Sequence, residues 1–291
     1  MGEAVTLSNI GRVYSALGEK DKALDYFEDA LPIHRQVSNR AGEADALSSI
    51  GRVYDALGEK DRALEYFEEA LSMFREVRNR VGEASTISTI GRLYNALGEK
   101  ARALEYYEEA LPIHREVSNR TGEAFTLGGM GVVYSAIGEQ AKAIDYYEQA
   151  LLIYREVRSR SGEADMLGNI GSVYDATGKK DKALEYYEQA LPIHREIRNR
   201  TGEAVALNNI GNVHNVTGEK GKALEYFEQA LSIHREIKNR AGEAVTLNNL
   251  GGLHADLGEK NKALEYHDQA LFIFIFFRYI SGEAFSIFII G

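Results

Sequence analysis

The chain has 291 residues, of which 44% are apolar and 27% are charged, with three prolines and no cysteine. The lack of cysteine excludes disulfides, thiolate metal sites and cysteine nucleophiles, and the net charge of −10 argues against a generally nucleic-acid-binding surface. The sequence shows no secretory signal pattern and no apolar run long enough to span a membrane, so we expect a cytoplasmic protein.

The sequence repeats every 40 residues without gaps. A Gly-Glu-Ala triplet marks each repeat and begins at Gly2, Gly42, Gly82, Gly122, Gly162, Gly202, Gly242 and Gly282. We therefore expect seven full repeats in residues 1–280, forming one continuous solenoid. A partial eighth repeat, with an apolar C-terminal end, is expected in residues 281–291.

Each repeat begins with a pattern typical of an amphipathic helix. In the first repeat the apolar residues recur at steps of three and four residues: Ala4, Leu7, Ile10, Tyr14 and Leu17. In the second repeat Asn39 is a residue type that caps helix N-termini, and Glu43 lies in the first turn. The glycine of Leu-Gly-Glu-Lys is expected to end this helix with a positive φ.

A second helix is expected from near Asp21, after a connection of about three or four residues, which makes the two helices antiparallel. Its apolar residues are Ala23, Leu24, Phe27, Ala30, Leu31, Ile33 and Val37. Gly11, inside the first helix, recurs in every full repeat although an interior glycine costs about 1 kcal/mol relative to alanine. We expect close packing against the second helix, through its small residues Ala23 and Ala30, to offset that cost.

The spacing of Leu7, Ile10, Gly11, Tyr14, Ala23, Phe27 and Ala30 resembles the tetratricopeptide repeat signature. The period is 40 rather than the common 34, and Asn-Arg-x-Gly-Glu-Ala replaces the usual proline between repeats. This variant resembles the repeats of LGN/Pins-type spindle-orientation adaptors, of kinesin light chains and of bacterial signalling proteins. The resemblance implies an all-α, right-handed superhelical solenoid of helix-turn-helix units, whose first helices line a concave groove that binds extended peptides.

Polar residues vary in an organised way at the first-helix positions that this resemblance places in the groove. Arg12, Arg52 and Arg92 share one position of the first three repeats, and they predict a row of guanidinium groups suited to carboxylates. Asparagines, which can hold a peptide backbone, occupy neighbouring positions. The candidate peptide-binding asparagines are Asn9, Asn169, Asn209, Asn212 and Asn249. These residues predict a groove in two parts, one lined by the arginines and one by the asparagines. We expect Gly128 and Gly129, beside Phe125, to form a shallow bend or pocket between them.

A purely structural interpretation of these residues stays open. Asp55 lies one turn after Arg52, so a surface ion pair would explain that arginine without any ligand. Arg12 and Arg92 lack acidic residues at such spacings, which favours ligand binding for them. The asparagines can equally be solvated.

No residue pattern predicts catalysis, a cofactor or a metal. His34, His114, His194 and His234 share one second-helix position, but their spacing of one or two repeats is too long for one ion to bridge. The Tyr and Phe pairs recur at core spacing, and the acidic residues of the second helices are expected to form a solvated convex face. Walker loops and nucleophile elbows are not found.

The C-terminal end breaks the pattern with a continuous apolar run over residues 271–277. It predicts self-association, because an exposed apolar patch of this kind marks an interface or an aggregation hazard. The candidate interface residues are Phe272, Phe274, Phe276, Phe277, Phe285, Phe288 and Ile289. A fragment whose missing repeats would cover this end, and membrane contact, are the alternatives.

The sequence favours a scaffold that binds a protein or an extended, acidic peptide in the groove, rather than an enzyme. Two other functions stay open. The repeats can serve as a structural module that oligomerises through the C-terminal end, or as the repeat region of a larger signalling enzyme.

Overall fold

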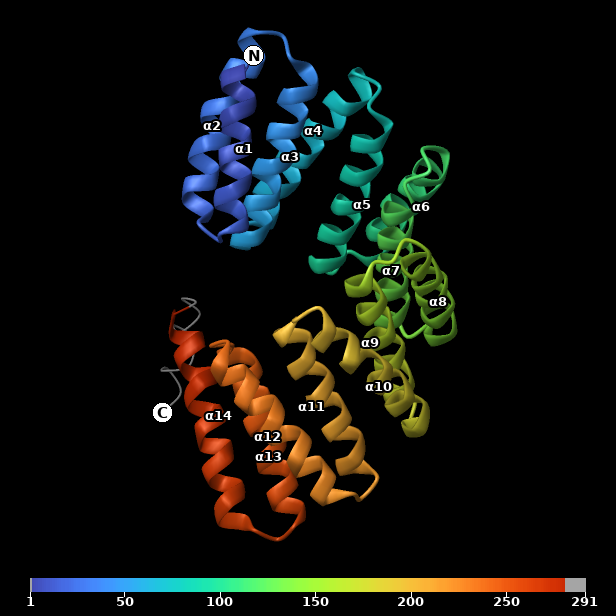
Figure 1. Cartoon of the computed structure of the whole chain (residues 1–291), viewed down its shortest axis with the longest axis vertical. Coiled ribbons are helices and arrows are strands. Elements are labelled where there is room, and N and C mark those ends of the chain that lie inside the picture. The colour runs from blue at the N-terminus through green and yellow to red at the C-terminus, as the bar shows by residue number, and fades with distance from the viewer. Residues whose placement is uncertain (1, 281–291) are drawn as a thin grey trace, which may run out of the picture. The chain divides into compact units, whose positions relative to one another are not determined.

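A computed structural model of the chain describes residues 2–280, which form α-helices joined by short turns (Figure 1). The helices are α1 (Gly2–Ala16), α2 (Lys20–Gln36), α3 (Arg40–Leu57), α4 (Lys60–Glu76), α5 (Arg80–Ala96), α6 (Lys100–Glu116), α7 (Arg120–Ala136), α8 (Gln140–Glu156), α9 (Arg160–Ala176), α10 (Lys180–Glu196), α11 (Arg200–Val216), α12 (Lys220–Glu236), α13 (Arg240–Asp256) and α14 (Lys260–Ile280). The predicted all-α architecture of helix-turn-helix units with a 40-residue period is confirmed. The expected partial eighth repeat lies outside the described residues.

The helices pair into hairpins, each made of an odd-numbered helix and the even-numbered helix that follows it. The chain divides into two compact halves, Met1–Val157 and Arg158–Gly291. The N-terminal half holds the hairpins of α1 to α8, and the C-terminal half holds those of α9 to α14. Among the described residues, no helix is long and apolar enough to cross a membrane.

The odd-numbered helices begin where the sequence predicts. Asn39 is the N-cap of α3, and its side chain accepts a hydrogen bond of 3.1 Å from the backbone N–H of Gly42. The same cap recurs at α5, α7, α11 and α13, and Ser159 serves α9. The asparagine of the Asn-Arg-x-Gly-Glu-Ala segment therefore starts each of these helices by satisfying a backbone N–H that has no partner within the helix.

Both the odd-numbered and the even-numbered helices are followed by a residue whose backbone is in the left-handed conformation, with a positive φ. The odd-numbered helices use glycine, as predicted, and Gly58 has a φ of 86°. The even-numbered helices use a side-chain-bearing residue instead, such as Arg78 or Ser118 with a φ of 56°. There the N–H of Asn79 donates to the carbonyl of Phe74 at 2.8 Å, which satisfies a carbonyl of the last turn. The chain thus accepts an unfavourable backbone angle at each junction between repeats.

The interior glycine of each odd-numbered helix faces an aromatic ring. A Cβ atom on Gly11 would lie 2.8 Å from the ring of Phe27, and one on Gly171 would lie 2.7 Å from the ring of Tyr187. Close packing against the second helix is therefore confirmed, but the nearest group is this ring rather than the small side chains. Ala23 is fully buried in the same layer.

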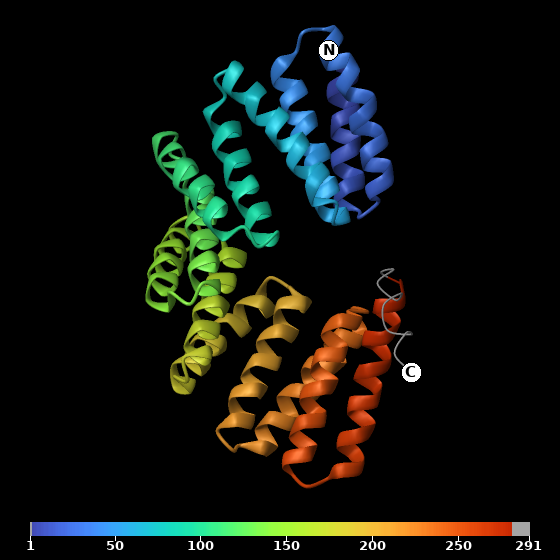
Figure 2. The same cartoon turned by 180° about the vertical axis from the view of Figure 1, so that it is seen from behind.

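Consecutive odd-numbered helices contact one another in the N-terminal half, as do α11 and α13 of the C-terminal half, and no pair of even-numbered helices among the described residues comes comparably close. The hairpins therefore fan apart on the side of the even-numbered helices. We call the exposed surface of the odd-numbered helices in each half the inner face (Figures 1 and 2).

Candidate functional site

The three predicted arginines lie in the N-terminal half, on α1, α3 and α5. Arg12 is exposed and has no polar partner among the described residues. Arg52 is also exposed, and its guanidinium donates a long hydrogen bond of 3.4 Å to the hydroxyl of Ser48 on its own helix. Both guanidinium groups are accessible to a ligand.

Arg92 forms an ion pair that the sequence analysis did not anticipate. Its Nη2 lies 2.5 Å from Oδ2 of Asp55 on α3, and Asp55 also contacts Nζ of Lys60 at 3.3 Å. Sequence spacing offers Asp55 as a possible ion-pair partner of Arg52 on the same helix, whereas the structure pairs it with an arginine 37 residues away. A ligand carboxylate would therefore compete with Asp55 for Arg92.

The predicted asparagines divide between the halves. Asn9 is exposed on α1, whereas Asn169, Asn209, Asn212 and Asn249 are partly buried on α9, α11 and α13 of the C-terminal half. Asn249 donates from Nδ2 to Oδ1 of Asn208 at 3.1 Å, so part of this set is engaged within the protein. Among the described residues, the side chains of Asn209 and Asn212 form no hydrogen bond with another side chain.

Two of these contacts cross between adjacent odd-numbered helices. The Arg92–Asp55 pair joins α5 to α3, and the Asn249–Asn208 bond joins α13 to α11. Polar groups of neighbouring repeats therefore lie within hydrogen-bonding distance on the inner face of each half. A peptide lying across these helices would meet one polar side chain after another.

The helix α7 adds an apolar section to the inner face of the N-terminal half. Phe125 is 40% exposed and Val132 is 37% exposed, and their spacing of seven residues places them on one side of the helix. A Cβ on Gly129 would lie 2.5 Å from the ring of Tyr107, so this glycine lets α7 pack closely there. The prediction of a pocket beside Phe125 stays a prediction.

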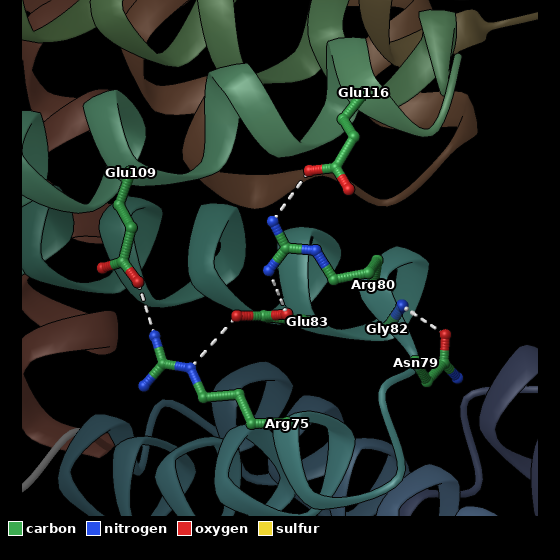
Figure 3. A network of polar contacts seen from close by, with 7 residues as sticks. All are labelled: Arg75, Asn79, Arg80, Gly82, Glu83, Glu109 and Glu116. Carbon is green, nitrogen blue, oxygen red and sulfur yellow. Dashed lines mark hydrogen bonds and ion pairs between the residues drawn. The ribbon is translucent and has the colours of Figure 1, made fainter.

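A buried carboxylate, which the sequence analysis passed over, organises each junction between repeats (Figure 3). The carboxylate of Glu83 accepts a hydrogen bond from Nε of Arg75 at 3.1 Å and another from Nη1 of Arg80 at 2.6 Å. Arg75 also reaches Glu109 at 2.5 Å, and Arg80 reaches Glu116 at 2.9 Å. The cluster ties the end of α4 to α5 and α6, and we call it the Arg–Glu node.

The Arg–Glu node recurs with the repeat. The buried glutamates are Glu43, Glu83, Glu123, Glu163, Glu203 and Glu243. Burial raises the pKa of Glu43, but hydrogen bonds and charge from Arg35 and Arg40 outweigh it and hold that pKa below its usual 4.5. The signal was present in the sequence: arginine and glutamate recur at offsets of 3, 8 and 36 residues. These residues explain the Gly-Glu-Ala triplet by structure rather than by ligand binding.

The histidines of the even-numbered helices are packing residues. His114 is 1% exposed, and a Cβ on Gly122 would lie 2.2 Å from its ring. Its Nε2 lies 3.1 Å from the hydroxyl of Ser88, which in turn contacts Thr126 at 2.8 Å. Burial lowers the pKa of His114 below its usual 6.5, which favours the neutral ring. The described residues contain no group of three potential metal ligands among His, Asp and Glu.

The predicted self-association surface is described only in part. Phe272, Phe274 and Phe276 on α14 are 72%, 47% and 55% exposed, and Ile275 is 57% exposed. Phe285, Phe288 and Ile289, together with the side chain of Phe277, lie outside the described residues. The described phenylalanines form an exposed apolar surface of the kind that mediates protein contacts.

The sequence model of the tetratricopeptide repeat matches residues 2–76, 82–156, 141–196 and 202–274. None of the curated protein sequences compared with the chain matches it significantly.

Solved structures show the same fold. The apo form of RapI superposes with a TM-score of 0.74 at 18% identity, over 93% of this chain and 97% of RapI. A Rap protein complexed with competence and sporulation factor has a TM-score of 0.70 at 16% identity, over 93% of this chain and 74% of its own. A putative kinesin light chain of P. anserina with TPR-like repeats has a TM-score of 0.54 at 20% identity, over 67% and 95% of the two chains. At these identities the likeness concerns the fold.

Proposed function

Because this chain belongs to the tetratricopeptide repeat family, we propose that it is an interaction scaffold whose inner face binds an extended peptide segment of a partner protein. The observation that carries the proposal is the polar surface that continues from one odd-numbered helix to the next, through Arg92–Asp55 in one half and Asn249–Asn208 in the other. A Rap protein of similar fold was solved in complex with the Phr* peptide, and another in complex with competence and sporulation factor, which supports this use of the fold.

We further propose that the N-terminal half selects acidic peptides. Arg12 and Arg52 are exposed, and neither guanidinium contacts a carboxylate among the described residues. A guanidinium binds a carboxylate bidentately, and such charge-assisted bonds are about twice as strong as neutral ones. The exposed Phe125 and Val132 would add an apolar contact for the same peptide.

A peptide-display selection tests both statements. Wild type is compared with the triple variant Arg12→Glu, Arg52→Glu and Arg92→Glu. A matched control makes the same charge change at exposed cations of the even-numbered helices. It is the triple variant Lys22→Glu, Arg62→Glu and Arg102→Glu. We expect wild type and control to enrich acidic peptides, and the inner-face variant to bind them at least tenfold more weakly in fluorescence anisotropy. Enrichment of non-acidic peptides would refute the acidic preference, and enrichment of none would refute the scaffold.

The exposed phenylalanines of α14 favour a second function, self-association through the C-terminal end. Replacing Phe272, Phe274 and Phe276 by serine should then convert an oligomer into a monomer in light scattering. Peptide binding to the inner face should be unchanged. A wild-type protein that is monomeric at all concentrations would rule this function out.

A further inference from the structure

One part of the Arg–Glu node is the same in the second to sixth repeats. The arginine that begins each odd-numbered helix contacts a glutamate three residues on and a second glutamate 36 residues on (Figure 3). These arginines are Arg40, Arg80, Arg120, Arg160 and Arg200, and their distant partners are Glu76, Glu116, Glu156, Glu196 and Glu236. Each guanidinium is therefore held between two carboxylates.

The seventh repeat departs from this arrangement. Arg240 contacts Glu243 at 2.7 Å, and Arg235 contacts the same carboxylate at 2.9 Å. The residue 36 positions after Arg240 is Phe276, so the second carboxylate is missing. Arg240 is accordingly more open, with 61% of its side chain exposed against 39% for Arg200. As in the node of Figure 3, two arginines share the buried glutamate, but here Arg240 has no second carboxylate from the end of the following helix.

A pocket of about 540 Å³ opens beside Arg240, between α13 and α14. Its apolar lining comes from Leu247, Phe272, Ile273 and Phe276. Pockets of this size hold small ligands, which gain affinity from apolar walls and orientation from a few polar groups. Glu243, Asp268 and Gln269 complete the lining. The pocket thus combines apolar walls with a guanidinium that lacks one of its usual partners.

We propose that this pocket binds a small apolar molecule ending in a carboxylate, such as a medium-chain carboxylic acid. The ligand's carboxylate takes the place that a glutamate occupies in the five preceding nodes, and its chain packs against Phe272 and Phe276. The charges of Glu243 and Asp268 in the lining disfavour anions without an apolar part, because such anions gain no burial to offset this repulsion. The site lies apart from the inner-face residues on which the peptide proposal rests.

The test uses isothermal titration calorimetry of the full chain with decanoate below its micelle concentration, and with decanol. We expect decanoate to bind at one site, with decanol roughly tenfold to a hundredfold weaker because it lacks the charge-assisted bond. Arg240→Gln should weaken decanoate by a similar factor and leave decanol unchanged. Arg80→Gln, in a complete node, is the matched control and should change neither affinity.

A second variant, Phe276→Glu, supplies the missing carboxylate from the chain itself. Glutamate occupies the equivalent position in the five preceding repeats, so the variant is expected to fold. It should abolish decanoate binding by satisfying Arg240 and by removing an apolar wall. Equal affinities for decanoate and decanol, retained binding in Phe276→Glu, or no binding of decanoate would each overturn the proposal.

Discussion

At the scale of the residue, the space around a glycine decides what it contributes. Gly168 and Gly171 lie three residues apart in α9. A Cβ on Gly171 would lie 2.7 Å from the ring of Tyr187, whereas a Cβ on Gly168 would meet no atom within 4 Å. The two glycines have the same helical propensity, so their difference lies in the packing alone.

We therefore expect alanine to act in opposite directions at these two positions. Gly168→Ala should raise the free energy of unfolding by about 1 kcal/mol, the difference in helix propensity between the two residues. Gly171→Ala should lower it by about 1–3 kcal/mol, because the new methyl group displaces the Tyr187 ring. Urea unfolding followed by circular dichroism measures both. Shifts of the two midpoints in the same direction would contradict the packing account.

At the scale of the element, the junctions between repeats depend on buried charge. The carboxylate of Glu203 is 8% exposed and lies 2.9 Å from Arg195 and 2.5 Å from Arg200. Burial raises the pKa of Glu203, but its hydrogen bonds and the charges of the two arginines outweigh that effect and lower the pKa below 4.5. A lowered pKa in the folded state means that ionised Glu203 stabilises the fold. That contribution is fully present above the unfolded pKa and is lost as pH falls through the folded pKa.

Glu203→Gln should accordingly lower the free energy of unfolding at pH 7 by about 1–3 kcal/mol, the usual cost of unsatisfied charge-assisted partners. The difference from wild type should shrink as pH falls below about 4.5, where wild type loses the same contribution. Glu228→Gln, which removes an exposed carboxylate from α12, is the control and should change little. Urea unfolding between pH 3 and pH 7 provides the comparison. A constant difference across that range would show that the ionisation of Glu203 does not matter.

At the scale of the whole molecule, the place of a repeat within its half decides how much an apolar residue contributes. Val13 on α1 and Val53 on α3 occupy the same position of successive repeats. Val13 is 59% exposed, whereas Val53 is 2% exposed because a preceding hairpin packs against it. The hairpins of a half thus stabilise one another through their contacts with neighbours.

Alanine at these equivalent positions should reveal that dependence. Val53→Ala should lower the free energy of unfolding by about 1–3 kcal/mol, because it removes two buried methyl groups and leaves a cavity. Val13→Ala should stay within about 0.5 kcal/mol of wild type, as is usual for exposed sites. Thermal unfolding of the two variants gives the comparison. Equal losses would indicate that Val13 is covered in solution.

Most of the fold follows from local patterns. The 40-residue period, the caps formed by Asn39 and its equivalents, and the glycine ends such as Gly58 rest on contacts within a few residues. The candidate site was predicted less completely. The sequence predicts Arg12, Arg52 and Arg92 as ligand-binding residues, which stays a prediction. It offers Asp55 as a partner of Arg52, whereas Asp55 pairs with Arg92, and it treats Glu43 as a first-turn residue without its arginine partners.

By itself the sequence determined that this protein is a series of helix hairpins, because helix periodicity and capping act along the chain. Only the tertiary structure decided that Arg92 binds Asp55, that the Phe27 ring covers Gly11, and that a buried glutamate such as Glu83 joins two arginines. The first and last of these join residues of successive repeats, up to 37 positions apart in the chain. Such pairings depend on how two repeats pack, and a pattern that is the same in every repeat does not specify which of several equivalent charges will meet.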